Sequence, residues 1–302
     1  MSSRRIVHVD LDSFYVSVER LLNSRLNGLP IIVGGNSDRG VVSSCSYEAR
    51  AFGVHAAMPI RKAKQLCPDA VFITGNMEKY SKYSNLVTDI IAENSPVYEK
   101  ASIDEHYIDI SGVDKFYSSL KWAQDLKSKI DKNTGLPISF AVSVNKTVAK
   151  IGTGEVKPLG EICIEQAEVN NFLDPLAITK IPMLGKKTFE ILSGIGLKTI
   201  KDIRETPVEK IVKLLGKNGQ SIWEKANGID NSEVIPYQEQ KSMSSETTFA
   251  NDINDINKML DIISEMAVNL AYKLRKEELL TSTVTVKIRY SDFDTQTLQK
   301  QI

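Results

Sequence analysis

The segment VHVDLDSFYV, residues 7–16, switches from the apolar period of a strand to that of a helix. Apolar and polar side chains alternate at first, which predicts a half-buried strand whose polar face carries Asp10 and Asp12. From Phe14 onward apolar residues recur at helical spacing, so a helix is expected to begin near Ser13. Phosphatases, glycosyltransferases and nucleotidyl transferases all use an Asp-x-Asp pair after a strand. The pair therefore indicates metal or phosphate chemistry without choosing among them.

The order of the expected elements divides the chain. Strands alternate with helices in the first region, which indicates an α/β arrangement. In residues 171–230 the strand signal vanishes, short helices with glycine breaks follow, and residues 231–242 have the composition of a polar linker. A strand (243–249), a helix (255–276) and a strand (283–290) close the chain. The further strands expected in the first region span 30–34, 41–46, 70–74, 97–101, 105–110 and 138–143, and its helices span 59–66, 78–93, 118–132 and 146–155.

Composition narrows the class of protein without indicating a partner. The length of 302 residues suggests two domains. Lys plus Arg and Asp plus Glu number 38 each, so only local clustering could indicate a nucleic-acid partner. Three scattered cysteines without a pairing pattern favour a reducing cytosol. The sequence shows neither a signal peptide nor a membrane span, so a cytoplasmic protein is expected.

Asp104 and Glu105, in ASIDEHYIDIS (residues 101–111), form a second acidic cluster at the start of an expected strand. Adjacent residues on a regular strand point to opposite faces, so both reach one metal only if the pleat is disturbed or Glu105 uses its longer side chain. With Asp10 they would suffice as ligands for two Mg²⁺ ions about 3.5–4 Å apart. A solvated strand end explains the pair equally well. Asp12 directly precedes the helix and is predicted to be its N-cap rather than a metal ligand.

Two further segments carry groups suited to phosphate. In SSCSYEARAFGVHAAMP, Tyr47 and Arg50 lie on one short helical turn and would offer a hydroxyl and a guanidinium to phosphate oxygens. The segment SVNKTVAKIGTGEVKPLG contributes three lysines, each of which taken alone is more typical of a solvated surface: Lys146, Lys150 and Lys157.

The segment ITKIPMLGKKTFEILSGIGLKTIKDI, residues 178–203, has the pattern of a helix-hairpin-helix. Such a turn presents main-chain N–H groups, together with Lys186 and Lys187, to a nucleic-acid phosphate without reading bases. LLGKNGQSIWEKANGID repeats the pattern with Lys217 and Gly219 before a helix. Basic residues outnumber acidic ones in this part of the chain, which favours phosphate contact.

In this order, the segments resemble the Y-family translesion DNA polymerases, most closely the bacterial DNA polymerase IV (DinB-type) branch. The signatures that carry the resemblance are VDLDSFYVSVE, SYEARAFGV followed by MP, SIDEHYID, NKTVAKIGTGEVKPLG and IPMLGKKT, within residues 5–230. The resemblance implies a template-directed DNA polymerase of the lesion-bypass type, which adds dNTPs to a primer 3′-hydroxyl by two-metal phosphoryl transfer without proofreading. A haloacid-dehalogenase phosphatase fits less well, because that family has a small-residue turn where this chain has Ser13-Phe14-Tyr15.

The fold implied by the resemblance is α+β: a right-hand polymerase with a ferredoxin-like palm, small fingers, a helical thumb with a helix-hairpin-helix and a partial β-α-β little finger. The estimate of two domains from length would then be too low. The last part resembles only the first half of a little finger and lacks the family's clamp-binding tail, so a truncated chain is expected. The implied ranges are 1–19 and 77–165 for the palm, 20–76 for the fingers, 166–231 for the thumb, 232–241 for a linker and 242–302 for the little finger.

The resemblance also implies roles for single residues. Two Mg²⁺ ions, replaceable by Mn²⁺, would be held by Asp10, Asp104, Glu105 and the main-chain carbonyl of Leu11. Tyr15 would be the steric gate whose ring excludes a ribose 2′-hydroxyl; it is rotated about 100° from the apolar stripe of its helix, so its loss is expected to cost little stability. The other implied dNTP contacts are Phe14, Ser44, Tyr47, Arg50 and Lys157, and the implied DNA contacts are Gly185, Lys186, Lys187, Lys217 and Gly219.

The expected partners are primer-template DNA and a dNTP, with no membrane, and a sliding clamp only through the absent tail. A monomer associated with the nucleoid is expected. Met183 replaces the usual glycine of the hairpin, which predicts a looser turn, and His106 replaces a small residue and is expected to pack or be solvated. Two rival functions remain: a nucleotidyl cyclase with a similar palm, and a DNA-binding module without polymerase activity because its little finger is incomplete.

Overall fold

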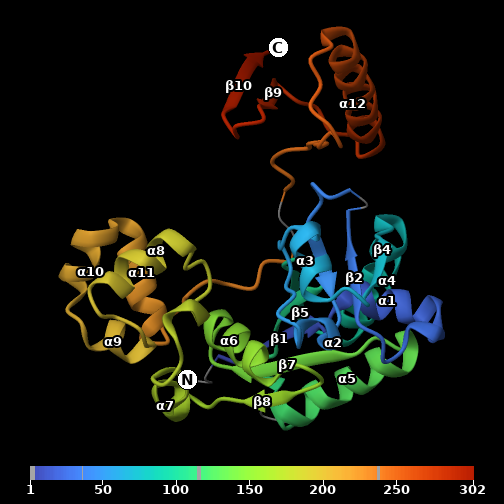
Figure 1. Cartoon of the computed structure of the whole chain (residues 1–302). Coiled ribbons are helices and arrows are strands. Elements are labelled where there is room, and N and C mark those ends of the chain that lie inside the picture. The colour runs from blue at the N-terminus through green and yellow to red at the C-terminus, as the bar shows by residue number, and fades with distance from the viewer. Residues whose placement is uncertain (1–3, 36, 114–116, 237–238) are drawn as a thin grey trace.

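The computed structural model describes residues 4–35, 37–113, 117–236 and 239–302. Figure 1 shows a mixed body of sheet and helices, a purely helical group attached to it, and a C-terminal unit of one helix and one hairpin. None of the described helices is long and apolar enough to cross a membrane.

A five-stranded sheet in the order β5-β6-β1-β7-β8 forms the centre of the body. β1 (Ile6–Leu11) lies between β6 (Glu105–Asp109) and β7 (Ile138–Ser143) and is antiparallel to both. β5 (Val97–Lys100) extends one edge. β8 (Glu161–Cys163), a strand that the sequence analysis missed, runs parallel to β7 at the other edge.

Helices cover both faces of this sheet. Val7, Val9 and Leu11 of β1 pack in one core with α4 (Met77–Asn94) and α5 (Ser119–Thr134). On the opposite face, His8 is hydrogen-bonded to Thr153 of α6 (Lys146–Val156). Every residue of β1 is buried, so the prediction of a half-buried strand is wrong. The reason is that β1 has a neighbouring strand on each side and helices over both faces.

A smaller sheet in the order β3-β2-β4 lies beside the first. Its central strand, β2 (Ile31–Gly34), pairs antiparallel with β3 and parallel with β4. Helix α1 contacts this sheet and also α4, so it joins the two sheets. The other elements here are α1 (Phe14–Leu22), β3 (Val42–Cys45), α2 (Tyr47–Arg50), α3 (Ile60–Leu66) and β4 (Val71–Thr74).

The helical group has a core of its own. Leu192, Ile200 and Ile211 are fully buried in it, and the same cluster continues into Val148 of α6. The group is therefore packed firmly on the body. Its helices are α7 (Val169–Leu173), α8 (Lys186–Gly194), α9 (Ile200–Glu205), α10 (Val208–Leu215) and α11 (Lys217–Ala226).

The segment after α11 differs from the sequence prediction in two respects. The expected linker, 231–242, is not free along its whole length, because Val234 is buried against Ile6, Tyr107 and Ala149 of the body. The expected strand 243–249 is wrong, because this segment is not in a strand and pairs with no strand among the described residues. Its Glu246 side chain is bonded to Lys287 of the nearby hairpin.

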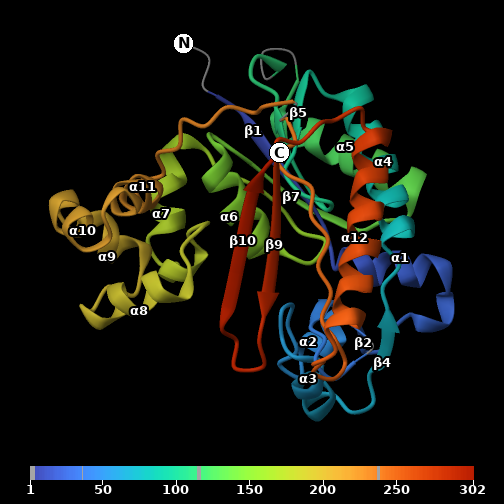
Figure 2. The same cartoon turned by 90° about the horizontal axis from the view of Figure 1, so that it is seen from above.

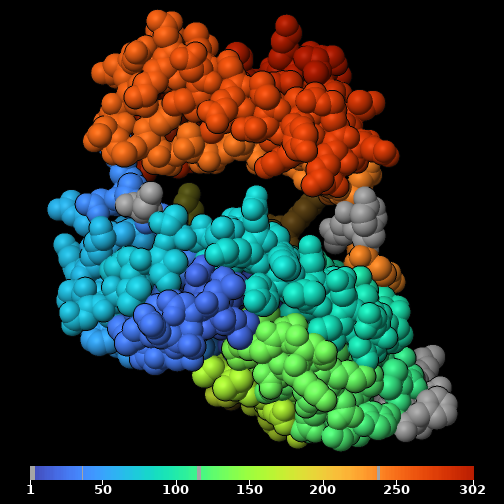
Figure 3. Space-filling model, turned by 90° about the vertical axis from the view of Figure 1, so that its right-hand side faces the viewer, coloured from blue at the N-terminus to red at the C-terminus, as the bar shows by residue number. Residues whose placement is uncertain are grey.

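The C-terminal unit consists of α12 (Ile256–Lys276) and an antiparallel hairpin of β9 (Thr283–Arg289) and β10 (Thr295–Gln301). The sequence did not predict β10, whose residues are nearly all polar. Figure 2 shows the hairpin and α12 on the same side of the body, and Figure 3 shows an open space between this unit and much of the body. Arg39 Nη1 lies 2.7 Å from Asp252 Oδ1, in the chain leading to α12.

Candidate active site

The three predicted metal-binding carboxylates meet at one end of the central sheet. Asp10, near the end of β1, stands opposite Glu105, the first residue of β6. The main-chain N–H of Leu11 donates to the carbonyl of Asp104 at 3.0 Å, which holds Asp104 beside the same strand. Residues almost a hundred positions apart in the sequence are thus neighbours because β1 and β6 pair antiparallel.

Two lysines of the segment 146–157 neutralise these carboxylates. Lys150 Nζ lies 2.6 Å from both oxygens of Glu105, and Lys157 Nζ forms an ion pair with Asp10. Among the described residues, no group of three or more His, Cys, Asp or Glu side chains is already arranged around one point as a metal site. The structure therefore brings the ligand-bearing residues together, with Asp10 and Glu105 paired to lysines and Asp104 bonded to Ser102.

Electrostatics favours a cation at this position. Burial raises the pKa of Asp10 to about 7; Lys157 lowers it, and the nearby Glu105 and Asp104 raise it further. A pKa raised in this way means that the buried negative charge is insufficiently compensated. Carboxylate and carbonyl oxygens are the ligands that Mg²⁺ and Mn²⁺ prefer, so these residues fit the predicted ions.

Asp12 does not cap α1, and that prediction is wrong. The N-cap residue is Ser13, which has a left-handed backbone (φ 45°, ψ 47°) and separates Asp12 from the first turn. The Asp12 carboxylate accepts hydrogen bonds from Tyr47 Oη at 3.2 Å, from Ser139 Oγ at 2.8 Å and from the Leu159 N–H at 2.8 Å. Asp12 therefore links the small sheet's helix α2 to the central sheet.

The predicted phosphate-binding groups of α2 lie next to this position. The Arg50 guanidinium lies over the Tyr47 ring, 4.5 Å from its centre, and donates to Ser13 Oγ at 3.2 Å. Burial, with the charge of Asp12, raises the pKa of Tyr47 to about 12, so its hydroxyl remains a neutral donor. Ser44 is half-buried on the adjacent strand β3. Tyr47, Arg50 and Lys157 thus reach Asp12, Ser13 and Asp10 of one short segment, although they come from different elements.

The two aromatic residues after the Asp-x-Asp pair have different environments. Phe14 is 3% exposed in the core, so its side chain is not available to a dNTP and the predicted contact could come only from its main chain. Tyr15 is half-buried, and its ring stacks on that of Tyr80 with centroids 4.3 Å apart and planes 15° apart. Tyr80, whose hydroxyl donates to Glu19 at 2.6 Å, was missed because nothing in the sequence indicates that α4 reaches α1 at this point.

Two buried histidines flank the site without belonging to its predicted ligands. His106 is fully buried and bonds to Thr88 at 3.0 Å, and burial lowers its pKa to about 4, so the expected packing role is confirmed. His8, which the sequence analysis did not single out, lies with Nε2 3.7 Å from Glu105 Oε1. Burial lowers the pKa of His8 well below its usual value, which makes it a neutral neighbour of Glu105.

In the helical group, the predicted hairpin has its lysines at the surface. Gly185 precedes α8, the Lys186 side chain is 89% exposed, and Lys187 is exposed as well. Gly219 is different: it is buried in α11, and a Cβ added there would lie 2.5 Å from the carbonyl oxygen of Ile211. The predicted DNA contact of Gly219 is therefore wrong, because the glycine is required where α10 and α11 approach closely.

The comparisons with known proteins agree with this geometry. The impB/mucB/samB family matches residues 9–154, and the C-terminal domain of that family matches residues 240–302. This chain belongs to that family, the Y-family DNA polymerases. DNA polymerase IV of Exiguobacterium sibiricum is 39% identical over 299 residues, which cover 98% of this chain and 83% of that protein. DNA polymerase IV of Staphylococcus aureus is 39% identical over 304 residues, which cover 100% of this chain and 92% of that protein.

Solved Y-family structures share the fold over nearly the whole chain. A Y-family DNA polymerase chimera of Dbh and Dpo4 has a TM-score of 0.87 at 29% identity, covering 99% of this chain and 88% of that one. The insertion ternary complex of Dbh DNA polymerase has a TM-score of 0.72 at 27% identity, covering 98% and 87%. The prediction of an α+β right-hand polymerase fold is confirmed, and the chain is a DNA-directed DNA polymerase of the lesion-bypass class.

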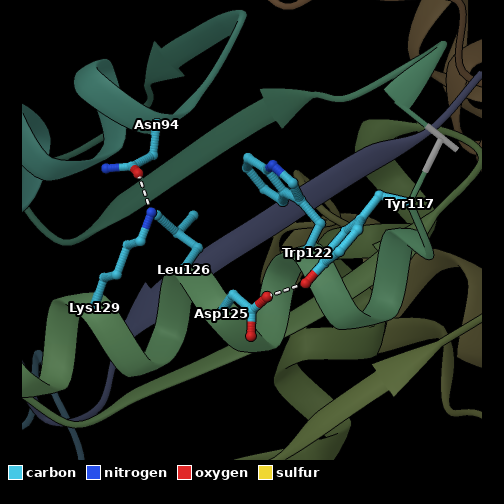
Figure 4. Close-up of a pocket in the computed structure, with 6 residues that line it drawn as sticks. All are labelled: Asn94, Tyr117, Trp122, Asp125, Leu126 and Lys129. Atoms are coloured by element: carbon cyan, nitrogen blue, oxygen red, sulfur yellow. Dashed lines mark hydrogen bonds between the residues drawn. The ribbon is translucent and has the colours of Figure 1, made fainter.

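A hollow elsewhere on this polymerase is separate from the carboxylates. It measures about 300 Å³ and lies between the end of α4 and the outer face of α5 (Figure 4). Within it, Lys129 contacts Asn94 and Tyr117 contacts Asp125. These contacts pair four of its six lining side chains, and none of the predicted site residues lines it.

Met183 gives a prediction on stability. It is 93% exposed and has φ of +72°, so it adopts the left-handed backbone that its hairpin position requires, although it is not a glycine. A left-handed conformation costs a residue with a Cβ roughly 1–2 kcal/mol. We expect Met183→Gly to raise the free energy of unfolding by about 1 kcal/mol. The gain is smaller than the strain that glycine relieves, because glycine also loses more conformational freedom on folding. Urea denaturation of Met183→Gly and of Met183→Ala measures the free energy of unfolding. An equal increase in Met183→Ala would mean that loss of the side chain, and not the left-handed backbone, is responsible.

Proposed function

We propose that the carboxylates Asp10, Asp104 and Glu105, with the main-chain carbonyl of Leu11, form the metal-dependent centre at which this polymerase joins a dNTP to a primer 3′-hydroxyl. The register that places Asp10 opposite Glu105, with Asp104 bonded to Leu11, carries the proposal. Two Mg²⁺ or Mn²⁺ ions held there would neutralise charge on the attacking and leaving oxygens.

The chain's own groups around this centre are suited to a triphosphate. Lys157 is an ammonium paired with Asp10, the Tyr47 hydroxyl is a neutral donor bonded to Asp12, and the Arg50 guanidinium lies over the Tyr47 ring. A guanidinium can bind two phosphate oxygens at once, and an ammonium acts as a point charge. We assign these three residues to the β- and γ-phosphates of a dNTP, while Tyr15 excludes a 2′-hydroxyl.

The proposed DNA contacts are non-specific. The exposed lysines of the helix-hairpin-helix, together with the N–H groups that precede α8, would bind backbone phosphates of primer-template DNA, which position the duplex without reading its sequence. The neighbour solved as an insertion ternary complex gives a precedent for the partners, primer-template DNA and an incoming nucleotide. Lys217, exposed at the start of α11, adds a contact of the same kind.

A primer-extension assay separates this function from its rivals. We expect template-dependent addition of dNTPs in Mg²⁺ and no addition after chelation with EDTA. A nucleotidyl cyclase would instead convert a nucleoside triphosphate to a cyclic product without a template. A pure DNA-binding module would shift DNA in a gel without extending it, and this outcome would overturn the proposal.

The lysines of the hairpin give a prediction on salt dependence. We expect Lys186→Ala with Lys187→Ala to weaken binding to all DNA sequences alike and to reduce the slope of log K against log salt by about 1.8, or 0.9 for each lost phosphate contact on duplex DNA. Fluorescence anisotropy between low and high salt measures the slope. Lys132→Ala, on the exposed side of α5, is the control and should leave the slope unchanged. The same slope in the double variant would show that the two lysines are only solvated.

A further inference from the structure

Ser102 makes an unusual number of contacts just before the strand that carries two of the proposed ligands. Its hydroxyl donates to Asp104 Oδ1 at 2.6 Å. The same oxygen accepts the main-chain N–H groups of Asp104, at 3.3 Å, and Glu105, at 3.0 Å. A serine hydroxyl has one donor and two acceptor lone pairs, so Ser102 uses its whole hydrogen-bonding capacity on the two residues.

The main chain turns sharply around this hydroxyl. The N–H groups of Ala101 and Ser102 both donate to the carbonyl of Glu105, at 3.0 and 3.3 Å, and β6 begins only at Glu105. Asp104 therefore lies outside the regular pleat. Consecutive residues of a regular strand point to opposite faces, so this turn allows both Asp104 and Glu105 to act on Asp10.

The hydrogen bond to Asp104 also restricts its carboxylate. Because Oδ1 accepts the hydroxyl proton, rotation of the carboxylate is limited, and Oδ2 keeps its lone pairs for another partner. Glu105 is restrained in a similar way by Lys150. Groups that orient a metal ligand in this manner are part of how a protein defines the geometry of the site.

We propose that Ser102 is a positioning residue of the polymerase reaction, whose hydroxyl shapes the turn before β6 and orients Asp104 so that Asp104 and Glu105 converge on the metal centre. This inference rests on the proposed function of those carboxylates. Ser102 would act through Asp104 and Glu105, the residues to which its hydroxyl is bonded.

The experiment compares Ser102→Ala with Ser102→Thr, which retains a hydroxyl. Mn²⁺ is titrated calorimetrically into the enzyme bound to primer-template DNA and a non-hydrolysable dNTP analogue, and kcat and the melting temperature are measured in parallel. Removing a group that orients a ligand typically costs 10–100-fold in metal affinity or activity, so we expect a loss of about 10-fold in Mn²⁺ affinity and in kcat for the alanine variant, and of less than about 3-fold for threonine. Ser128→Ala, an exposed serine bonded within α5, is the control for hydroxyl loss.

The outcomes separate this inference from the function on which it rests. If Asp104→Asn loses Mn²⁺ affinity but Ser102→Ala titrates like wild type, the metal centre stands and the role of Ser102 is wrong. If Asp104→Asn also titrates like wild type, the proposed centre itself is wrong. Should Ser102→Ala fail to fold, Ser102→Cys, which has a similar shape but bonds weakly, replaces it. Equal losses in the threonine and alanine variants would show that the hydroxyl is not responsible.

Discussion

Asp104→Asn is expected to abolish nearly all nucleotide incorporation, lowering kcat by roughly 10³-fold or more, which corresponds to about 4 kcal/mol in the activation free energy. In the proposed mechanism no protein nucleophile can take over, because the charge that develops on phosphate is neutralised by metal. The amide has nearly the same shape as the carboxylate but no charge. Ser102 can still donate to its oxygen, so the fold should be retained.

Single-turnover primer extension measures this effect, with DNA affinity and melting temperature as measures of intact structure. Asp109→Asn is the matched control, because Asp109 lies at the far end of β6 from Glu105. Among the described residues, its carboxylate accepts a hydrogen bond from the Ser111 N–H and faces Arg4 at 3.9 Å. We expect this control to extend primers normally. Near-normal extension by Asp104→Asn would remove Asp104 from the centre.

Tyr15→Ala is expected to raise ribonucleotide incorporation by at least about 10²-fold relative to dNTP incorporation. A loose apolar pocket rejects an added hydroxyl by only about 10²-fold, so strong rejection needs a rigid wall. The structure supplies that rigidity: the Tyr15 ring stacks on Tyr80, and the Tyr80 hydroxyl is bonded to Glu19. The contact with Tyr80 therefore restricts movement of the Tyr15 ring, as an effective steric gate requires.

The ratio of kcat/KM for dNTP to that for rNTP measures this selectivity. Tyr15→Phe keeps the ring and should keep the selectivity, whereas Phe14→Ala should lower the free energy of unfolding by about 3–5 kcal/mol through loss of core packing. The sequence alone predicted that loss of Tyr15 would cost little stability. Because Tyr15 stacks on Tyr80, we expect Tyr15→Ala to lower the free energy of unfolding by about 1 kcal/mol through loss of this aromatic pair. Sugar selectivity that survives Tyr15→Ala would mean that another residue is the gate.

Local patterns in the sequence were sufficient to predict many of the helices and strands of this polymerase. The change of apolar period after Asp12 was sufficient to predict β1 and the start of α1, because strand and helix periods differ and only apolar side chains need burial. The apolar patterns around SIDEHYID and NKTVAKIGTGEVKPLG likewise predicted β6 and α6, whereas the roles of Asp104, Glu105 and Lys157 were assigned only by the family resemblance. Motifs of this kind are short and contiguous, so they can be read without knowledge of distant contacts.

The tertiary structure decided which partners those residues have. Asp12 has the sequence context of an N-cap, yet its carboxylate bonds to Tyr47, Ser139 and Leu159, which come from three separate segments. Gly219 lies two residues after Lys217 in a hairpin-like pattern, yet it is needed for the contact between α10 and α11. Tyr80 and Lys150 similarly acquire their roles only when α4 and α6 pack against the elements beside them. Contacts between side chains that are distant in the sequence depend on how whole helices and strands pack. The spacing of apolar residues within one element does not specify which side chains of another element it will contact.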